Sequence, residues 1–562
     1  METSAKISCQ ILVDLLVANN ITNVVLSPGS RNAPLVIAMS RCEALNKHIV
    51  IDERSAAFVA LGMAIESGAP TVLVCTSGTA VLNYSPAIAE AYYRRVPLIV
   101  VSADRPAEWI DQDDSQTLRQ FEALANYVKR SYNIPDNICN ETSIWYVNRI
   151  INDAIINATS GRFAPVHINM QFDEPLNGIV DNMVTRRVVT NVECYSQLSK
   201  TDAQQLAAKI NQSNKVLIIA GFNNPDKKLN SALSKLAQFD NVVIMTESIA
   251  NLKDKRFIST IDRVLCAMSP EEKKEAQPDI VITLGGALVS RHIKQYLRNI
   301  SPVEHWHIGV TENTIDCFKC LSKRININAD GFFSQISKLV QPNARSSYAK
   351  LWSDINMRAS LRHNNYVKSV EWSDIKAFDI IFSNIPKKWN IHLSNGTSIR
   401  YAQLFDTTIF RRSECNRGVS GIDGSTSTAI GASVACPVTT LLITGDMSAQ
   451  YDIGALALKQ VSPRFKMIVI NNGGGGIFRF IKSTSQLPEL DEYFACQTNL
   501  PLAQLAEGFG FDYYNASNEN ELKRNLKLFV NKNDKPAILC INTPANESAT
   551  ILKNYFTKNK LT

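Results

Sequence analysis

Short apolar runs alternate along the whole chain with stretches in which apolar residues recur at helical spacing. The runs "TVLVC" at 71–75, "VLIIA" at 216–220 and "LLIT" at 441–444 are almost wholly apolar and end in polar or glycine-rich segments. Such runs are typical of strands that are buried on both faces of a sheet. Strands that alternate with helices predict parallel, doubly wound sheets with right-handed crossovers, so the predicted fold class is α/β.

This alternation falls into three blocks, because polar stretches interrupt it twice. The two stretches are "RRVVTNVECYSQLSK" and "QPNARSSYAKLWSDINMRASLRHNNY". A chain of 562 residues is also too long for a single hydrophobic core. We therefore expect three domains, at residues 1–185, 186–355 and 356–562.

Two polar turns in the third block follow apolar strands that one crossover joins. Asp446 follows the strand in "LLITGD", Asn472 follows the strand in "KMIVINN", and "GALALKQV" between them is expected to form the crossover helix. Because the carboxyl ends of such strands meet at one edge of the sheet, the two turns should lie side by side where α/β proteins bind ligands. A carboxylate, an amide and glycine carbonyls there suit Mg²⁺, which takes oxygen ligands and usually keeps phosphate oxygens in its shell.

A further acid, Glu53, lies where the short strand "HIVID" passes into a helix rich in small residues. An acid in the first turn of a helix is often there because the helix dipole favours it. The same carboxylate can instead serve a cofactor, and the local sequence leaves both interpretations open.

Composition and charge exclude several classes of function. Hydrophobic residues make up 45% and charged residues 20% of the chain, and the net charge of +7 comes without a run of lysine or arginine, so we expect no nucleic-acid partner. No segment approaches the roughly 18 unbroken apolar residues of a membrane span, so we expect no membrane insertion. The N-terminal segment has the spacing of an amphipathic helix instead of the continuous apolar core of a signal peptide, which predicts a cytoplasmic protein.

The twelve cysteines are scattered along the chain. Cys317 and Cys320 form the only CxxC pair, and a zinc site would need a second pair at suitable spacing. Most of the others, such as Cys75, lie in apolar strands and are expected to be small buried hydrophobic residues.

Longer motifs make the chain resemble a known family. The "GD" and "NN" turns and the spacing between them resemble the thiamine diphosphate signature, with Met447 in place of its usual third glycine. Six stretches resemble motifs of the SEPHCHC synthase family of menaquinone biosynthesis: "LSPGSRNAPL", "DERSAAFVALGMA", "TSGTAVLNYSPAIAEAYY", "SADRPAEWIDQDDSQTLRQ", "CNRGVSGIDGSTSTAIGA" and "GDMSAQYDIGALAL". These motifs lie in the first and third blocks, and the middle block is only weakly similar.

The resemblance implies a transferase that uses thiamine diphosphate and Mg²⁺, with Mn²⁺ as an alternative metal. The family decarboxylates 2-oxoglutarate and adds the succinyl unit in 1,4 fashion to isochorismate. Glu53 would be the catalytic residue, hydrogen-bonded to N1′ of the cofactor's aminopyrimidine. In such enzymes the acid of one subunit faces the metal-binding domain of another, which implies a homodimer or homotetramer with sites between subunits.

Both implied substrates are dianions, and an arginine fork pairs well with a carboxylate. The family's substrate-binding residues fall in this chain on Ser30, Arg31, Arg105, Ser115, Gln116, Arg291, Arg400 and Arg417. Two positions depart from the family pattern. Ser115 stands where asparagine is common, and Ser290 stands where lysine is common, so one charged contact is in question.

The resemblance also assigns cofactor contacts. Asp446, Asn472 and the carbonyl of Gly474 would bind the metal. The residues expected around the cofactor are Ile422, Gly445, Asp446, Met447, Ser448, Asn472, Gly474, Ile477 and Phe478. Backbone N–H groups at a helix N-terminus would face the diphosphate, and the apolar side chains would keep the site dry, which favours decarboxylation.

Three alternatives remain open at this stage. The glycine run at 473–476 suggests a flavin- or NAD-binding loop, but it does not match the spacing of a dinucleotide fingerprint. Another thiamine-dependent decarboxylase or carboligase would share the cofactor residues but would not need five arginines. A non-catalytic paralogue should have lost Glu53, Asp446 or Asn472, and this chain retains all three.

Overall fold

A computed structural model describes residues 2–181, 186–192, 194, 196–343, 345–459, 461–497 and 499–557. The chain forms two compact units. Unit 1 comprises residues 1–193, 418–440 and 451–465, and unit 2 comprises residues 194–417, 441–450 and 466–562. The first domain boundary expected from the sequence, after residue 185, lies outside the described residues.

Unit 1 contains a six-stranded parallel sheet with the strand order β3-β2-β4-β5-β7-β6. Its strands are β2 (Asn23–Leu26), β3 (Asn46–Ile49), β4 (Thr71–Cys75), β5 (Leu98–Asp104), β6 (Ser131–Ile134) and β7 (Val166–Gln171). The helices of the unit are α1 (Ile7–Ala18), α2 (Ala33–Ser40), α3 (Glu53–Ser67), α4 (Ala80–Asn83), α5 (Ser85–Arg94), α6 (Glu141–Thr159) and α16 (Ser425–Ala435). A short antiparallel pair joins β1 (Glu2–Ser4) to β8 (Ile179–Asp181).

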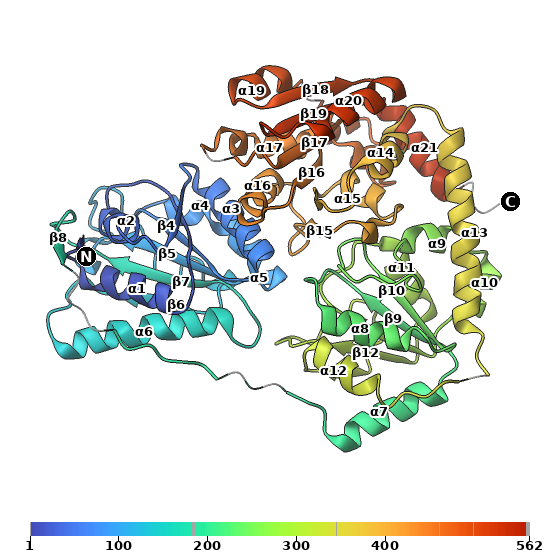
Figure 1. The fold of residues 1–562 in the computed structure, drawn as a ribbon, viewed down its shortest axis with the longest axis horizontal. Helices are drawn as coiled ribbons and strands as arrows, with labels where there is room; N and C mark the ends of the chain where they lie inside the picture. The colour runs from blue at the N-terminus through green and yellow to red at the C-terminus, as the bar shows by residue number, and fades with distance from the viewer. Residues whose placement is uncertain are drawn as a thin grey trace. The chain divides into compact units, whose positions relative to one another are not determined.

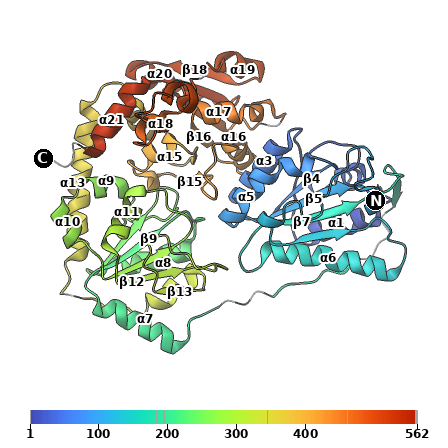
Figure 2. The same cartoon turned by 180° about the vertical axis from the view of Figure 1, so that it is seen from behind.

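Alternate residues of the central strands enter two separate cores, one on each face of this sheet. Val72 and Val74 of β4 pack with α1, α2 and α6, whereas Leu73 and Cys75 pack with α3 and α5. Figures 1 and 2 show these helices around the sheet. Burial on both faces explains why the strands are apolar at every position, as expected for a doubly wound parallel sheet.

Helices α3 and α16 cross in unusually close contact. A Cβ atom at Gly62 of α3 would overlap the backbone oxygen of Thr428, and one at Gly431 of α16 would overlap the backbone oxygen of Val59. Glycine at both positions therefore lets the two backbones touch. This contact fixes the helix that begins with Glu53.

Unit 2 contains two sheets, and the first has the parallel order β10-β9-β11-β12-β13. Its strands are β9 (Val216–Ala220), β10 (Val242–Thr246), β11 (Ile280–Leu284), β12 (Glu304–Ile308) and β13 (Lys323–Ile325). The helices of this part are α7 (Lys200–Gln212), α8 (Lys227–Leu236), α9 (Ile261–Ala267), α10 (Pro270–Glu275), α11 (Arg291–Ile300), α12 (Ala329–Ile336) and α13 (Tyr348–Ser369). Helices α7, α8 and α12 share one core with the sheet, and α9, α11 and α13 share the other.

The second sheet of unit 2 has the order β15-β14-β16-β17-β19-β18. Its strands are β14 (Asn390–Leu393), β15 (Arg412–Cys415), β16 (Thr440–Gly445), β17 (Phe465–Asn471), β18 (Asp512–Ala516) and β19 (Ala537–Asn542). The helices are α14 (Asp374–Asn384), α15 (Thr397–Ala402), α17 (Asp446–Tyr451), α18 (Gly476–Phe480), α19 (Leu502–Gly508), α20 (Glu519–Asn531) and α21 (Ala545–Thr557). β16 and β17 are neighbours at the centre of the sheet, so the turns that follow them share one edge.

Three parallel sheets flanked by helices confirm the predicted α/β fold class. One expected element is wrong. The crossover between β16 and β17 begins as α17 at Asp446 and continues as a 3₁₀ turn over Ile453–Ala457, so the helix starts inside the "GDMS" motif, ahead of "GALALKQV". No helix in the described part of the chain has the length and apolar character needed to cross a membrane.

Candidate active site

The two turns expected to bind a cation meet at the carboxyl edge of the second sheet of unit 2. Asp446 follows β16 and Asn472 follows β17. Oδ1 of Asp446 accepts the N–H of Met447, and Oδ2 accepts the N–H of Gly474, both at 2.7 Å. The Gly474 contact joins the two turns directly, and both polar side chains are buried.

A neighbouring carboxylate orients the amide of Asn472. Nδ2 of Asn472 donates to Oδ2 of Asp374 at 2.9 Å, and the hydroxyl of Thr543 donates to the other oxygen of Asp374 at 2.5 Å. Because Nδ2 is committed to Asp374, Oδ1 is the atom of the amide that can bind a cation. Asp374 is the first residue of α14 and is fully buried, so it acts through Asn472.

The chemistry of this donor set fits Mg²⁺. One carboxylate, one amide oxygen and a glycine carbonyl leave room for the water and phosphate oxygens that Mg²⁺ retains. Burial raises the pKa of Asp446 to about 6, against the opposing effect of the backbone N–H groups around it. A bound cation would stabilise the ionised carboxylate. No cluster of three or more His, Cys, Asp or Glu side chains that could hold a metal occurs among the residues that the structure describes.

The Gly474 turn is shaped by close backbone contacts. Its φ of +124° and the nearness of the Ala495 backbone oxygen leave no space for a side chain. The Gly474 carbonyl accepts the N–H of Gly476 at 2.9 Å, which leaves a second lone pair on the oxygen.

The other expected cofactor residues of unit 2 lie around these turns. The N–H of Gly445 approaches Oγ of Ser394 at 3.4 Å, and Ser448 is buried in the first turn of α17. Ile477 and Phe478 belong to α18, where the ring of Phe478 lies 5.8 Å from that of Phe494. Ile422 belongs to unit 1, in the loop before α16.

Glu53 is the first residue of α3 in unit 1 and is partly buried. The preceding residue, Asp52, caps this helix by accepting the N–H of Ser55. The N-cap role is therefore filled by Asp52, and Glu53 is available for another partner. The charge of Glu53 acts on Cys75 and Tyr84, so it lies close to the carboxyl end of β4.

The expected substrate-binding residues of unit 1 gather at the carboxyl edge of its sheet. Arg31 donates from its backbone to Oγ1 of Thr76 and from Nη1 to the Phe172 oxygen. Arg105 forms an ion pair with Asp114 at 2.9 Å. Burial and the nearby charge of Arg105 lower the pKa of Arg31.

The loop that follows Arg105 brings two more predicted residues to the same edge, and Ser30 directly precedes Arg31. Nε of Arg105 donates to the backbone oxygen of Ser115, and Nε2 of Gln116 donates to that of Ser77 at 3.0 Å. Ser30, Ser115 and Gln116 are exposed. Their polar groups are therefore accessible to a ligand at this edge.

The three remaining arginines come together in unit 2. Arg291 begins α11, Arg400 lies on α15, and Arg417 follows β15. Burial together with the charges of Arg291 and Arg417 lowers the pKa of Arg400 to about 10. Nε of Arg400 and Nε of Arg417 are buried without hydrogen-bond partners among the described residues. Unsatisfied buried cationic donors are costly, and an anion would satisfy them.

Sequence reasoning did not assign the supporting roles of several side chains that hold these groups. Asp374 orients Asn472. Asn395 accepts from Nη1 of Arg417 at 3.0 Å. Ser290, which stands where the family commonly has lysine, caps α11 by accepting the N–H of Ile293. The serine at the start of a helical segment was a visible capping signal, but the partners of Asp374 and Asn395 are distant in sequence.

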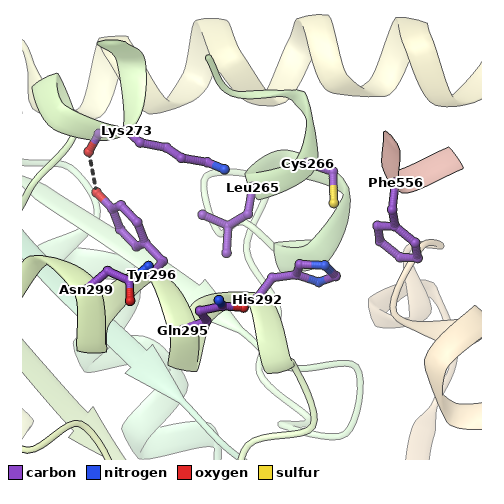
Figure 3. Close-up of a pocket in the computed structure, with 8 residues that line it drawn as sticks. All are labelled: Leu265, Cys266, Lys273, His292, Gln295, Tyr296, Asn299 and Phe556. Carbon is purple, nitrogen blue, oxygen red and sulfur yellow. Dashed lines mark hydrogen bonds between the residues drawn. The ribbon is translucent and has the colours of Figure 1, made fainter. Parts of the chain in front are cut away.

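A separate cavity of about 300 Å³ lies beside α11. Its lining residues are Leu265, Cys266, Lys273, His292, Gln295, Tyr296, Asn299 and Phe556. Figure 3 shows His292 pointing toward Phe556, with the rings stacked 4.8 Å apart. None of the predicted site residues lines this cavity.

Comparison with known proteins defines the class of this fold and site. Models of three thiamine pyrophosphate enzyme domains match the chain: the N-terminal TPP binding domain at residues 9–123, the middle domain at 188–391, and the C-terminal TPP binding domain at 397–541. The protein is therefore a thiamine diphosphate-dependent enzyme of the α/β type. The cofactor that the first and third models name is thiamine pyrophosphate, in agreement with the signature of the "GD" and "NN" turns.

Similarity over nearly the full length narrows the class. The chain is 41% identical to the 2-succinyl-5-enolpyruvyl-6-hydroxy-3-cyclohexene-1-carboxylate synthase of Porphyromonas gingivalis, over 99% of this chain and 97% of the relative. It is 38% identical to the synthase of the same name from Christiangramia forsetii, over 97% of each chain. Identity to that of Flavobacterium johnsoniae is 37%, over 97% of this chain and 98% of the relative. The chain belongs to this SEPHCHC synthase family.

Proposed function

We propose that the protein decarboxylates 2-oxoglutarate and transfers the succinyl unit in 1,4 fashion to isochorismate, as a step of menaquinone biosynthesis. When bound, thiamine diphosphate supplies the carbanion-stabilising chemistry that both half-reactions need. The protein's own residues bind the two dianions, orient them, exclude water and hold a proton at N1′ of the cofactor.

The observation that carries this proposal in the structure is the cluster of Arg291, Arg400 and Arg417. Burial, together with the charges of the other two guanidinium groups, lowers the pKa of Arg400, and Arg400 and Arg417 each have a buried donor without a partner among the described residues. Such a cluster suits a ligand with more than one carboxylate, because each guanidinium group can bind both oxygens of one carboxylate. A small neutral acceptor would leave these charges uncompensated.

The roles of the remaining residues are those that the resemblance to the family implies. Asp446, Oδ1 of Asn472 and the Gly474 carbonyl would hold the metal. Gly445, Met447 and Ser448 would lie against the diphosphate, and Ile422, Ile477 and Phe478 would exclude water. Glu53 would hold the proton that is shared with N1′. Ser30, Arg31, Arg105, Ser115 and Gln116 would complete the binding of the anionic substrates.

The proposal includes assembly. We propose a homodimer or homotetramer in which Glu53 of one subunit and the metal-binding turns of another serve the same cofactor, and we expect it in the cytoplasm. The resemblance in the cofactor motifs supports this arrangement, because in such enzymes the acid of one subunit faces the metal-binding domain of another.

Product analysis tests the function. Purified protein with thiamine diphosphate, Mg²⁺, 2-oxoglutarate and isochorismate should release CO₂ and give a product whose mass equals isochorismate plus 2-oxoglutarate minus CO₂. The Asp446→Ala variant is the matched control and should give no product. Release of CO₂ with a different acceptor, such as pyruvate, and none with isochorismate would assign another carboligase instead. Absence of cofactor binding would contradict the enzymatic interpretation altogether.

A further inference from the structure

Glu247 is a buried carboxylate that none of the proposed roles uses. It follows β10 in unit 2, directly after Thr246, and its side chain is 1% exposed. Burying a carboxylate is costly unless hydrogen bonds satisfy it. The partners of Glu247 therefore indicate what the residue stabilises.

Those partners lie at the ends of two helices, α11 and α15. Oε1 of Glu247 accepts the backbone N–H of Ser290 at 3.0 Å, and Oε2 accepts Nε2 of Gln403. The amide of Gln403 is held at its other end, where Oε1 accepts the backbone N–H of Ser248 at 3.0 Å. One carboxylate and one amide thus form a continuous chain of hydrogen bonds across three elements.

Each end of this chain adjoins one of the clustered arginines. Ser290 is the N-cap of α11, and Arg291 is the next residue. Gln403 is the C-cap of α15, one turn beyond Arg400. We infer that Glu247 is a positioning residue that holds Arg291 and Arg400 at the separation required to bind a dicarboxylate. This inference rests on the proposed function, because it assigns those arginines to substrate.

Other charged groups lie near Glu247 on the helices α9 and α11. Asp262 of α9 accepts the hydroxyl of Ser290 and lies 3.3 Å from Nδ1 of His292, and its charge also acts on Arg400. Lys294 of α11 lies in the field of Glu247. Burial raises the pKa of Glu247 to about 7, with a smaller contribution from Asp262 and opposition from the N–H groups of Ser290 and Val289.

A charge-swapped pair tests the inference. In the Glu247→Gln variant, the NH₂ groups of two amides, at positions 247 and 403, face each other. In the Gln403→Glu variant, two carboxylates face each other at the same positions. In the double variant Glu247→Gln/Gln403→Glu, the amide at 247 accepts from Ser290 and donates to the carboxylate at 403, which also accepts from Ser248. Every hydrogen bond of the chain is restored, so the double variant should recover what each single variant loses.

The measurement is steady-state kinetics with 2-oxoglutarate and isochorismate. Each single variant should raise KM for 2-oxoglutarate about tenfold, the typical effect of losing a hydrogen bond to a charged group, with kcat changed less. The double variant should return to within about threefold of wild type. Affinity for thiamine diphosphate, measured by quenching of tryptophan fluorescence, should be unchanged in all three. Glu304→Gln, at the opposite edge of the same sheet, is the control for loss of a carboxylate in this part of unit 2.

The pH dependence of the wild-type enzyme, compared with that of two single variants, gives a second test. As pH falls through the Glu247 pKa of about 7, the carboxylate gains a proton and loses an acceptor site, so KM for 2-oxoglutarate should rise. The rise should be absent in Glu247→Gln and retained in His292→Gln, which removes the nearby imidazole.

The outcomes separate this inference from the proposed function. If wild-type protein makes no product from the two substrates, the function itself is wrong. If wild type is active, but Glu247→Gln keeps its KM and its pH profile, Glu247 is not a positioning residue. A folded double variant that fails to recover KM would also overturn the inference.

Discussion

At the scale of single residues, two departures from the family pattern have a structural explanation. Met447 replaces a glycine, but the group that it contributes to the Asp446 carboxylate is its backbone N–H. Its sulfur would lie 2.9 Å from a Cβ at Gly475, so glycine at 475 makes room for it. Ser290 replaces a lysine and caps α11 ahead of Arg291. At Met447 the backbone N–H keeps the contact and the side chain is free to vary, whereas at Ser290 the side-chain hydroxyl itself takes the capping role.

Glu53→Gln tests the residue on which the proposed chemistry depends most. The variant should bind thiamine diphosphate and Mg²⁺ normally and lose turnover by about a factor of 10² to 10⁴, because the amide cannot share a proton with N1′. Cofactor titration and kcat measured on the same preparation check this. Asp52→Asn is the matched control, since an asparagine still caps α3. Turnover retained within a few-fold would mean that Glu53 has another role.

At the scale of elements, the central strands β4, β9 and β16 were predictable, and four of the edge strands were not. β4, β9 and β16 are buried apolar runs whose pattern is visible in the sequence. β6, β13, β15 and β18 lie at the edges of their sheets, and segments such as "SYNI" and "RSEC" carry polar residues. An edge strand lacks a neighbour on one side and needs less apolar surface, so its sequence resembles that of a loop. The boundary of α17 was missed because its first residue, Asp446, was assigned to a turn.

The crossing of α3 and α16 gives a prediction at this scale. Gly62→Ala should lower the free energy of unfolding by about 3 kcal/mol, because the new methyl group must displace backbone at Thr428. Thermal unfolding measures this directly, and activity should fall as well, since α3 begins with Glu53.

The matched control for this helix crossing is Gly508→Ala at the end of α19, where a Cβ would meet no atom within 4 Å. It should leave the melting temperature unchanged or slightly higher. Equal melting temperatures for the two variants would show that α3 and α16 do not pack through Gly62.

At the scale of the whole molecule, the sequence indicated the residues expected to bind the ligands, but it did not indicate the distant side chains that hold those residues in place. Arg31, Arg105, Arg417 and the expected cation ligands could be named because they lie in compact motifs. Glu247 and Asp374 could not, because their partners Gln403 and Asn472 are 156 and 98 residues away. Contacts of that separation depend on how the sheets pack and leave no local pattern. The middle part of the chain, whose motifs were weakest, contributes Glu247, the carboxylate inferred to position Arg291 and Arg400.

Mixed oligomers test whether the active site is shared between subunits. The Glu53→Gln protein and the Asp446→Ala protein should each be inactive when purified alone. The two chains can also be co-expressed with different tags and purified as a heterodimer. This heterodimer should have about half of the wild-type activity per dimer, because one of its two shared sites keeps both Glu53 and Asp446. The reciprocal heterodimer, wild type with the Glu53→Gln/Asp446→Ala chain, should be inactive, since each shared site then lacks one group. If a single chain formed its own complete site, the two results would be exchanged: the first heterodimer would be dead, and the second would have half activity. Because the two arrangements predict opposite outcomes from equally matched proteins, the comparison decides between them even if the variants lower stability.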